Sequence, residues 1–354
     1  MATPTRSLKQ ASAKTVREML EDRERAQLAP FATFAGDSRG RQRQEKEHDY
    51  RTAFQRDRDR ILHTKSFRRL KQKTQVFLAP KGDHYRTRLT HTLEVAQISR
   101  TVARALFVNE DLTEAIALGH DLGHTPFGHA GEVVLNEAFA EGFRHYEQSL
   151  RVVDTLETRR SGGGLNLTHE VREGILNHSV GKVVLLGKAA KSGTTPEATI
   201  VSVCDAIAYI NHDIEDAVRG GLITLNDLPK DAIELLGRAS SQRINRMVIA
   251  LIEGSQDDGI GMIEDVRQAT VDLRAYLYTN LYPCEAINRE VRKAKKLLKE
   301  LYYHFLEHPS RESSAGNPDD SIERRTVDFI AGMTDPFALE VYRHLFFPDS
   351  WPAR

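Results

Sequence analysis

The sequence predicts an all-α fold, and three observations support this prediction. Apolar residues recur with the spacing of a helix face over 89–107. The same spacing returns through most of the chain after residue 198. Strict alternation of apolar and polar residues, which marks a half-buried strand, is almost absent. We therefore expect helices packed on helices, with short hairpins at most.

The expected helices can be placed in order along the chain. The first lies in a polar N-terminal segment, and the second carries many Arg and Lys residues among three apolar ones. The helices expected in the first two thirds cover 15–25, 89–107, 112–120, 146–158 and 198–218, and 57–74 is expected to form a helix and a turn. Those expected in the last third cover 230–252, 263–281, 285–306, 322–333 and 336–346.

Segments rich in glycine and polar residues separate these helices. Loops are expected over 36–43, 159–167, 187–198 and 310–321, with short hairpin candidates at 75–78 and 183–186. Thr168 is the expected N-cap of a further helix. The chain then divides into an N-terminal arm over 1–48, a core over 49–225 and a C-terminal helical region over 226–354 that packs on the core.

Bulk composition limits the location of the protein more than its partners. Lys plus Arg and Asp plus Glu both number 50, so net charge says little about what the chain binds. Charge is uneven, however, because 39–73 holds thirteen basic residues and five acidic ones. Two cysteines, no apolar run of ~20 residues and no apolar signal segment predict a cytoplasmic protein without membrane spans.

The most informative segment is IALGHDLGHTPFGHAGE, residues 116–132. It places five ionisable groups between glycines and a proline, which predict a kinked turn. For a lone histidine, an ordinary hydrogen bond would be the better explanation. Five such groups together are costly to hold in an apolar fold unless an ion or a substrate binds them. The group comprises His120, Asp121, His124, His129 and Glu132.

Two distant residues, His91 and Asp205, complete a metal-ligand set. With His120 and Asp121 they offer two nitrogens and two oxygens to one divalent cation. Such a set suits Mg, Mn, Co, Ni, Fe or Zn with open positions for water. His120 and Asp121 point ~100° apart on an ideal helix, so both reach one ion only at a helix end, which Gly123 provides.

Helical spacing adds candidates for substrate contact. Arg88 lies three residues before His91 and shares its face of the helix. Asp205, Tyr209 and Asp213 are spaced by four and form one stripe. A packing tyrosine and a solvated helix acid are the alternative interpretations of the last two.

These motifs resemble one known family. The pattern H…HD…D is similar to that of HD phosphohydrolases, and HDLGHTPFGHAGE resembles the signature of the deoxyguanosinetriphosphate triphosphohydrolase family. The resemblance continues over 50–347, through segments such as RILHTKSFRRLKQKTQV, YEQSLRVV and CDAIAYINHDIEDAVRGGLI. It implies the helical HD-domain fold and metal-dependent cleavage of deoxynucleoside triphosphates to deoxynucleoside and inorganic triphosphate.

The resemblance also implies roles for single residues. The metal ligands match His91, His120, Asp121 and Asp205. Groups next to the α-phosphate match Arg88, His124 and His129, with Glu132 as the partner of His129. Groups around the sugar 3′-hydroxyl match Tyr209, Asp213 and, in a shorter segment, Gln75. Apart from the resemblance, their charge makes five basic residues candidate partners of the triphosphate tail, with a solvated charged face as the alternative for each: Arg60, Lys65, Arg68, Arg69 and Lys73. A homo-oligomer, such as a hexamer, is implied as well.

Two alternatives stay open at this point. The first is an HD phosphohydrolase that acts on a monophosphate, a cyclic nucleotide or a guanosine polyphosphate. The second is a regulatory protein that keeps a vestigial site and binds single-stranded nucleic acid through the basic stretch 39–73.

Overall fold

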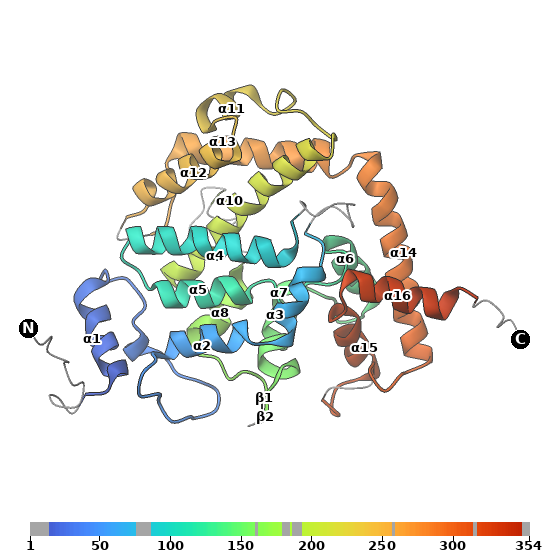
Figure 1. The fold of residues 1–354 in the computed structure, drawn as a ribbon, viewed down its shortest axis with the longest axis horizontal. Helices are drawn as coiled ribbons and strands as arrows, with labels where there is room; N and C mark the ends of the chain where they lie inside the picture. Colours follow the sequence, from blue (N-terminus) through green and yellow to red (C-terminus); the bar gives the residue numbers. More distant parts are fainter. Residues whose placement is uncertain are drawn as a thin grey trace, which may run out of the picture.

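The computed structural model describes residues 14–75, 86–159, 162–178, 185, 193–256, 259–313 and 317–348. Within these residues nearly all regular structure is helical (Figure 1), which confirms the predicted fold class. A minimal antiparallel hairpin pairs β1 (Thr158–Arg159) with β2 (Gly162–Gly163), inside a segment expected to be a loop. None of the described helices is long and apolar enough to cross a membrane.

The centre of the larger of two hydrophobic cores lies between five helices. α4 packs along α5, α2 packs on α5, and α10 runs diagonally across them (Figure 1). α8 fills the space between α5 and α10. The bounds are α2 Ala53–Leu62, α4 Arg88–Ala105, α5 Glu110–Gly119, α8 His169–Asn177 and α10 Pro196–Arg219.

Capping side chains explain where the three central helices begin. Thr87 forms a capping box at the start of α4, and Asn109 accepts the backbone N–H of Leu112 at the start of α5. Thr195 caps α10 directly before Pro196, whose missing N–H is not needed at the first helical position. These caps fix the register of the helices that carry the site.

The turn after α5 is held in place by glycine. A Cβ on Gly123 would lie 2.1 Å from the backbone nitrogen of Ser149, so only glycine lets this turn press against α7 (His145–Arg151). Phe127 and Gly128 then adopt positive φ angles of 60° and 56°. The next helix, α6 (His129–Ala138), starts immediately afterwards. This confirms the kinked turn.

A second, smaller core is built by α6 and the C-terminal helices, on the right of Figure 1. There α14 packs on α6, α15 and α16. Three other helices belong to the larger core instead: α12 and α13 pack on α10, and α11 packs on α12 and α13. The bounds are α11 Lys230–Leu236, α12 Ser240–Gly254, α13 Glu264–Tyr276, α14 Glu285–Glu307, α15 Ile322–Ala331 and α16 Asp335–Phe346.

The structure corrects one predicted helix. The span 230–252 is not continuous, because Gly237 ends α11 with a φ of 103° before α12 begins. Apolar periodicity continues across this break, which is why the sequence pattern missed it. Both hairpin candidates, 75–78 and 183–186, lie almost entirely outside the described residues.

The N-terminal arm lies against the core. After α1 (Val16–Gln27), the backbone and hydroxyl of Thr33 both bond to the buried carboxylate of Glu197 in α10. Arg41 pairs with Asp57, which is fully buried in α2. The proposed boundaries at 48 and 225 remain a prediction. The remaining short elements are the helix α3 Lys65–Arg69, the 3₁₀ turns Ala35–Asp37 and Leu70–Gln72, and the π-helical turns Val152–Leu156 and Leu277–Leu281.

Candidate metal centre

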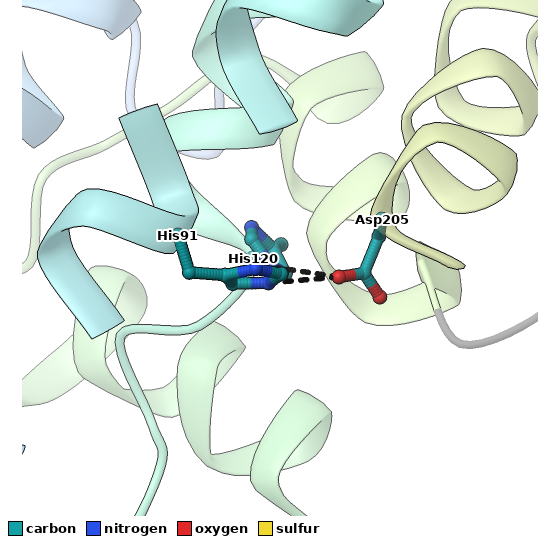
Figure 2. A group of neighbouring side chains, drawn as sticks. All are labelled: His91, His120 and Asp205. Carbon is teal, nitrogen blue, oxygen red and sulfur yellow. Dashed lines mark hydrogen bonds and ion pairs between the residues drawn. The ribbon is translucent and has the colours of Figure 1, made fainter. Parts of the chain in front are cut away.

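Three of the four predicted metal ligands converge from three helices. His91 comes from α4, His120 follows the end of α5, and Asp205 comes from α10 (Figure 2). Their ligand atoms lie within 4.8 Å of one another. Asp205 Oδ1 lies 2.9 Å from His91 Nε2 and 3.8 Å from His120 Nε2. The Asp205 side chain is 24% exposed, so the group is not sealed from solvent.

The hydrogen-bond pattern of His120 fits a metal ligand. Its Nδ1 lies 2.6 Å from the carbonyl oxygen of Ala117, which can only accept, so Nδ1 carries the proton. Nε2 is then a bare lone pair, and it is buried without a hydrogen-bond partner. A buried orphan acceptor costs stability, and a cation that it can bind removes that cost. Histidine ligands commonly bind metal in this way, with the other nitrogen fixed on a carbonyl or carboxylate.

A second chain of contacts fixes the ring of His91. Its Nδ1 lies 3.4 Å from Nδ1 of His212, and Nε2 of His212 lies 2.5 Å from the carboxylate of Glu94. His212 lies two turns after Asp205 on the same helix, so α10 contacts both nitrogens of the His91 ring. Burial lowers the pKa of His212 even though Glu94 opposes this effect. His212 lies outside the predicted ligand set.

Asp121 lies at the junction between two groups of side chains. Its Oδ1 is 3.4 Å from His120 Nε2 and 3.2 Å from His124 Nε2, and its Oδ2 accepts from Arg88 at 2.8 Å. Burial alone would raise the pKa of Asp121, but the neighbouring imidazoles and Arg88 hold it well below its usual range. Burial would also raise the pKa of Asp205, but His91 and His120 hold it at about 2. Both carboxylates are therefore ionised and available to a cation.

Two histidines that the motif did not predict join this centre. His145 begins α7 and stacks on His124, with ring centroids 4.0 Å apart and planes 15° apart. His178 follows α8, is 2% exposed, and brings its Nε2 to 3.2 Å from Nε2 of His145. Burial lowers the pKa of His178 to about 3 and holds the pKa of His124 well below its usual value. His145 directly precedes the YEQSLRVV segment, a signal that could have revealed it.

Glu132 connects the motif to His145. Its Oε1 accepts from the backbone N–H of His145 at 3.0 Å and lies 2.9 Å from Nδ1 of that ring. Its Oε2 lies 3.3 Å from Nδ1 of His129. Burial opposes ionisation of Glu132, but these imidazoles lower its pKa below the usual range.

His129 is set apart from the buried imidazoles. Its side chain is 86% exposed, whereas that of Glu132 is 9% exposed. The structure therefore brings His91, His120, Asp121, His124, Glu132 and Asp205 into one group and places His129 at its solvent edge.

The predicted sugar-side residues line the next turns of α10. The hydroxyl of Tyr209 accepts from Arg274 Nε at 2.7 Å, and Asp213 accepts from the hydroxyl of Tyr282. Burial raises the pKa of Asp213 to about 7. Neither Arg274 nor Tyr282 was predicted, because both come from a region far along the chain. The backbone oxygen of Gln75 accepts from Nη2 of Arg88 at 3.4 Å. The side-chain oxygen of Gln75 is buried without a hydrogen-bond partner.

Much of the basic stretch is used inside the protein. Arg60 pairs with Glu45, and Lys73 is buried and donates to the carbonyl oxygens of His124 and Ala331. Burial lowers the pKa of Lys73 to about 7. Neither side chain is free to bind a triphosphate or a nucleic acid in this arrangement. The other candidates for the triphosphate tail are exposed on α3: Lys65, Arg68 and Arg69.

Comparisons with known proteins identify the domains of the chain. The HD domain model matches residues 88–210, which include all four predicted metal ligands. A phosphohydrolase-associated domain model matches residues 260–344. A phosphohydrolase structure from Bacteroides thetaiotaomicron has a similar fold, with a TM-score of 0.50 at 17% identity, over 82% of this chain and 68% of that one.

Full-length relatives are much more similar. A deoxyguanosinetriphosphate triphosphohydrolase-like protein of Caldanaerobacter subterraneus is 52% identical over 340 residues, which cover 95% of this chain and 97% of that protein. A protein of the same name from Desulfatibacillum aliphaticivorans is 47% identical over 94% of this chain and 99% of that one. The chain therefore belongs to the deoxyguanosinetriphosphate triphosphohydrolase-like family of HD-domain phosphohydrolases.

Proposed function

We propose that this protein hydrolyses deoxynucleoside triphosphates to a deoxynucleoside and inorganic triphosphate with a bound divalent metal ion. The observation that carries the proposal is the buried, partnerless Nε2 of His120, which faces Asp205 and Asp121 within a family of phosphohydrolases. The ligand set is intact, so the alternative of a vestigial site gains no support from it. Arg60 pairs with Glu45 and Lys73 donates to the carbonyl oxygen of Ala331, so neither offers its charge to a nucleic acid, which weakens that alternative.

His91, His120, Asp121 and Asp205 would hold the metal. Two nitrogens and two carboxylate oxygens suit Mn, Fe, Co, Ni, Zn or Mg. When bound, such an ion polarises a phosphoryl oxygen and lowers the pKa of a coordinated water. The chain's own residues account for the remaining steps.

Positive charge next to the centre would stabilise the α-phosphoryl group. Arg88 is 4% exposed and already lies beside Asp121. Its guanidinium can donate to a phosphoryl oxygen while keeping its contact with the carboxylate, because it presents several N–H groups in one plane. His124, whose Nδ1 is buried and unpartnered, offers a further hydrogen-bonding group.

His129 and Glu132 would move the proton to the leaving 5′ oxygen. Glu132 holds Nδ1 of His129, so Nε2 of that ring points away from the carboxylate and is available to a substrate. High exposure suits this role, because a group that must contact a substrate has to be reachable from solvent. A positioned acid of this kind contributes about 10²–10⁴-fold to a rate.

Tyr209 and Asp213 would select the sugar. They lie one and two turns beyond Asp205 on α10, where a nucleoside attached to the α-phosphate would lie. Asp213 is buried and accepts a hydrogen bond from the hydroxyl of Tyr282. Its remaining lone pairs can accept a hydrogen bond from the sugar 3′-hydroxyl.

Product analysis tests the function directly. The purified chain is incubated with each of the four deoxynucleoside triphosphates and with Mn, Mg, Co or Ni, in water that carries a heavy oxygen isotope. We expect inorganic triphosphate that contains the isotope and an unlabelled deoxynucleoside, because attack at the α-phosphorus breaks the bond to the 5′ oxygen. Release of orthophosphate or pyrophosphate, or label in the nucleoside, would contradict the proposal.

A further inference from the structure

We propose that Lys73 and Asp335 are positioning residues that hold the turn 124–128 and thereby fix where His129 meets the substrate. Lys73 follows the 3₁₀ turn Leu70–Gln72, and Asp335 is the first residue of α16, far along the chain from the motif (Figure 1). This inference rests on the proposed function for its effect on turnover. The contacts that carry it do not depend on the substrate.

Two backbone groups of the turn depend on side chains from other segments. Inside the turn, the amide of Gly128 donates to the carbonyl oxygen of Thr125, and the hydroxyl of Thr125 donates to the carbonyl oxygen of Gly128. The carbonyl oxygen of His124 and the amide of Phe127 bond instead to Lys73 and to Asp335. Because buried backbone groups need partners, these two bonds restrict where the turn can lie.

Asp335 is buried and accepts hydrogen bonds from two segments at once. Its Oδ1 accepts from the amide of Phe127 at 2.9 Å. Its Oδ2 accepts from the amide of Thr74 at 2.9 Å and also from the hydroxyl of Thr74. A charged acceptor forms stronger hydrogen bonds than a neutral one. One carboxylate therefore ties the turn firmly to the segment next to Lys73.

Lys73 holds the other end of the turn. Its buried ammonium group donates to the carbonyl oxygen of His124 and, at 2.8 Å, to that of Ala331. Ala331 is the last residue of α15, where backbone carbonyls lack partners within the helix and a cation is favourable. The backbone oxygen of Lys73 accepts from the amide of Arg88, so the same residue is fixed to the start of α4.

The turn needs this support because its backbone is strained. Phe127 has a φ of 60°, which is rare for a bulky residue, and Gly128 has a φ of 56°. Strained conformations persist only where the surroundings hold them, and they are common at active sites. A Cβ on Gly128 would lie 3.0 Å from the guanidinium of Arg88 and 3.5 Å from the backbone oxygen of Thr74. The segment that carries Lys73 and Thr74 therefore presses directly on the turn.

The turn also determines where α6 begins, and with it the place of His129. The carbonyl oxygens of Phe127 and Gly128 accept amides from the first turn of α6. His129 is the first residue of that helix, and its ring lies 3.3 Å from the carboxylate of Glu132. A shift of about 1 Å at a catalytic group can cost ~10²-fold in rate. The two positioning residues would therefore affect turnover without touching the substrate.

Hydrogen exchange tests these contacts without any substrate. Asp335→Ala removes the acceptor of the Phe127 amide, and Glu340→Gln, at an exposed acid on the same helix, is the matched control. In Asp335→Ala, we expect amides in peptides that cover 123–130 to exchange about tenfold faster, while those of α4, α5 and α10 keep their protection. Glu340→Gln should exchange like the wild type. A folded Asp335→Ala chain with wild-type exchange in this turn would overturn the proposal.

Kinetics separate a positioning role from a purely structural one. In Asp335→Ala, kcat should fall by about tenfold or more, whereas KM and metal content stay near their wild-type values. In a His129→Gln background, the same substitution should have little further effect, because the group that it positions is already absent. An equal loss of kcat in both backgrounds would show that Asp335 does not act through His129.

Two further variants keep the test decisive if Asp335→Ala does not fold. Asp335→Asn keeps an oxygen for the amide of Phe127 but turns an NH₂ group toward the donors of Thr74. Lys73→Met replaces the buried ammonium group with an apolar chain of similar length, and leaves the carbonyl oxygen of His124 without this donor. Both variants should show faster exchange in the turn and a lower kcat. Wild-type behaviour of both folded variants would contradict the proposal.

A failure of the proposed function would look different. If no deoxynucleoside triphosphate yields triphosphate, the substrate assignment is wrong, and exchange still decides whether Asp335 and Lys73 hold the turn. The kinetic comparison then uses the phosphate ester that the protein does cleave. If triphosphate is released and the folded variants match the wild type in exchange and in kcat, the function stands and the positioning role does not.

Discussion

The buried imidazoles and His129 belong to the same centre but differ in two measurable ways. His120 and His178 are almost completely buried, and their Nδ1 atoms contact backbone carbonyl oxygens. His129 is 86% exposed, and Nδ1 of its ring lies 3.3 Å from the carboxylate of Glu132. A metal ligand needs a fixed lone pair, which burial and anchoring provide. A group that transfers a proton to a substrate needs access. This contrast between a buried, anchored His120 and an exposed His129 is the one that the proposed roles, a ligand of the ion and an acid for the substrate, require.

The largest expected effect comes from removing a ligand on the buried side. Asp205→Ala should abolish both metal binding and turnover, because the ion supplies several kcal/mol of transition-state stabilisation. Turnover should fall by about 10³-fold or more, since each ~1.4 kcal/mol corresponds to a factor of ten. Metal content and triphosphate release are measured on the same sample, with the exposed Asp272→Ala as control. An Asp205→Ala variant that keeps full metal occupancy would remove Asp205 from the ligand set.

Replacing the exposed His129 should affect turnover without affecting metal binding. His129→Gln should keep its metal but lose turnover by about 10²-fold, the usual scale for a positioned acid. The measurement is kcat together with metal content, and Glu132→Gln should reproduce part of the loss. If His129→Gln turns over at nearly the wild-type rate, exposure reflects a structural surface residue and another group must supply the proton.

Sequence and structure contributed differently to this contrast. Chain breakers and helical spacing were enough to predict that His120 lies at a helix end and that His91 and Asp205 approach it. The sequence could not show that His145 and His178 join them, because their approach depends on how α7 and α8 pack. Within the motif, the pattern treated His124 and His129 alike. Only the turn at Phe127 and Gly128 directs the first inward and the second to the surface.

Sequence patterns were also insufficient outside the metal centre. Periodicity predicted most helices, since each buries one apolar face, but it did not detect the break at Gly237. It also could not show that the basic residues Arg41 and Arg60 are used in internal ion pairs. Their partners, Asp57 and Glu45, are acidic residues in the same stretch, and only the fold determines which pairs meet.

Anchoring of a ligand can be tested at His91. His212→Phe removes the contact with Nδ1 of His91 but keeps an aromatic ring of similar size in the buried position. We expect affinity for the metal ion to fall by about 10–100-fold, the usual effect of losing such a partner. Competition with a coloured chelator measures the affinity, and a folded variant with unchanged affinity would show that Asp205 alone orients the His91 ring.

Sugar choice is a smaller effect on the substrate side. The wild-type enzyme should cleave deoxynucleotides well and both ribonucleotides and dideoxynucleotides poorly, because a missing 3′-hydroxyl leaves buried polar groups unpaired. The deoxy-to-dideoxy ratio of kcat/KM should be about tenfold or more. Asp213→Asn should narrow that ratio, whereas Asp227→Asn, at an exposed turn, should not. Equal cleavage of GTP and dGTP by the wild type would count against the sugar pocket even if the predictions for Asp205→Ala and His212→Phe hold.

The smallest effect concerns stability and again depends on burial. Burial raises the pKa of Asp213 to about 7, while an unfolded aspartate titrates near ~3.9. Between these values the folded state binds more protons than the unfolded state, so wild-type stability falls as pH rises through this window and levels off above it. Asp213→Asn lacks this titration. Relative to wild type it should therefore gain stability between about pH 5 and about pH 8, by ~1 kcal/mol or more. Urea unfolding of the metal-free chains at both pH values measures the gain, with the exposed Asp272→Asn as control. A constant difference across the window would show that Asp213 is ionised throughout, and that a charged carboxylate rather than a neutral one accepts from Tyr282.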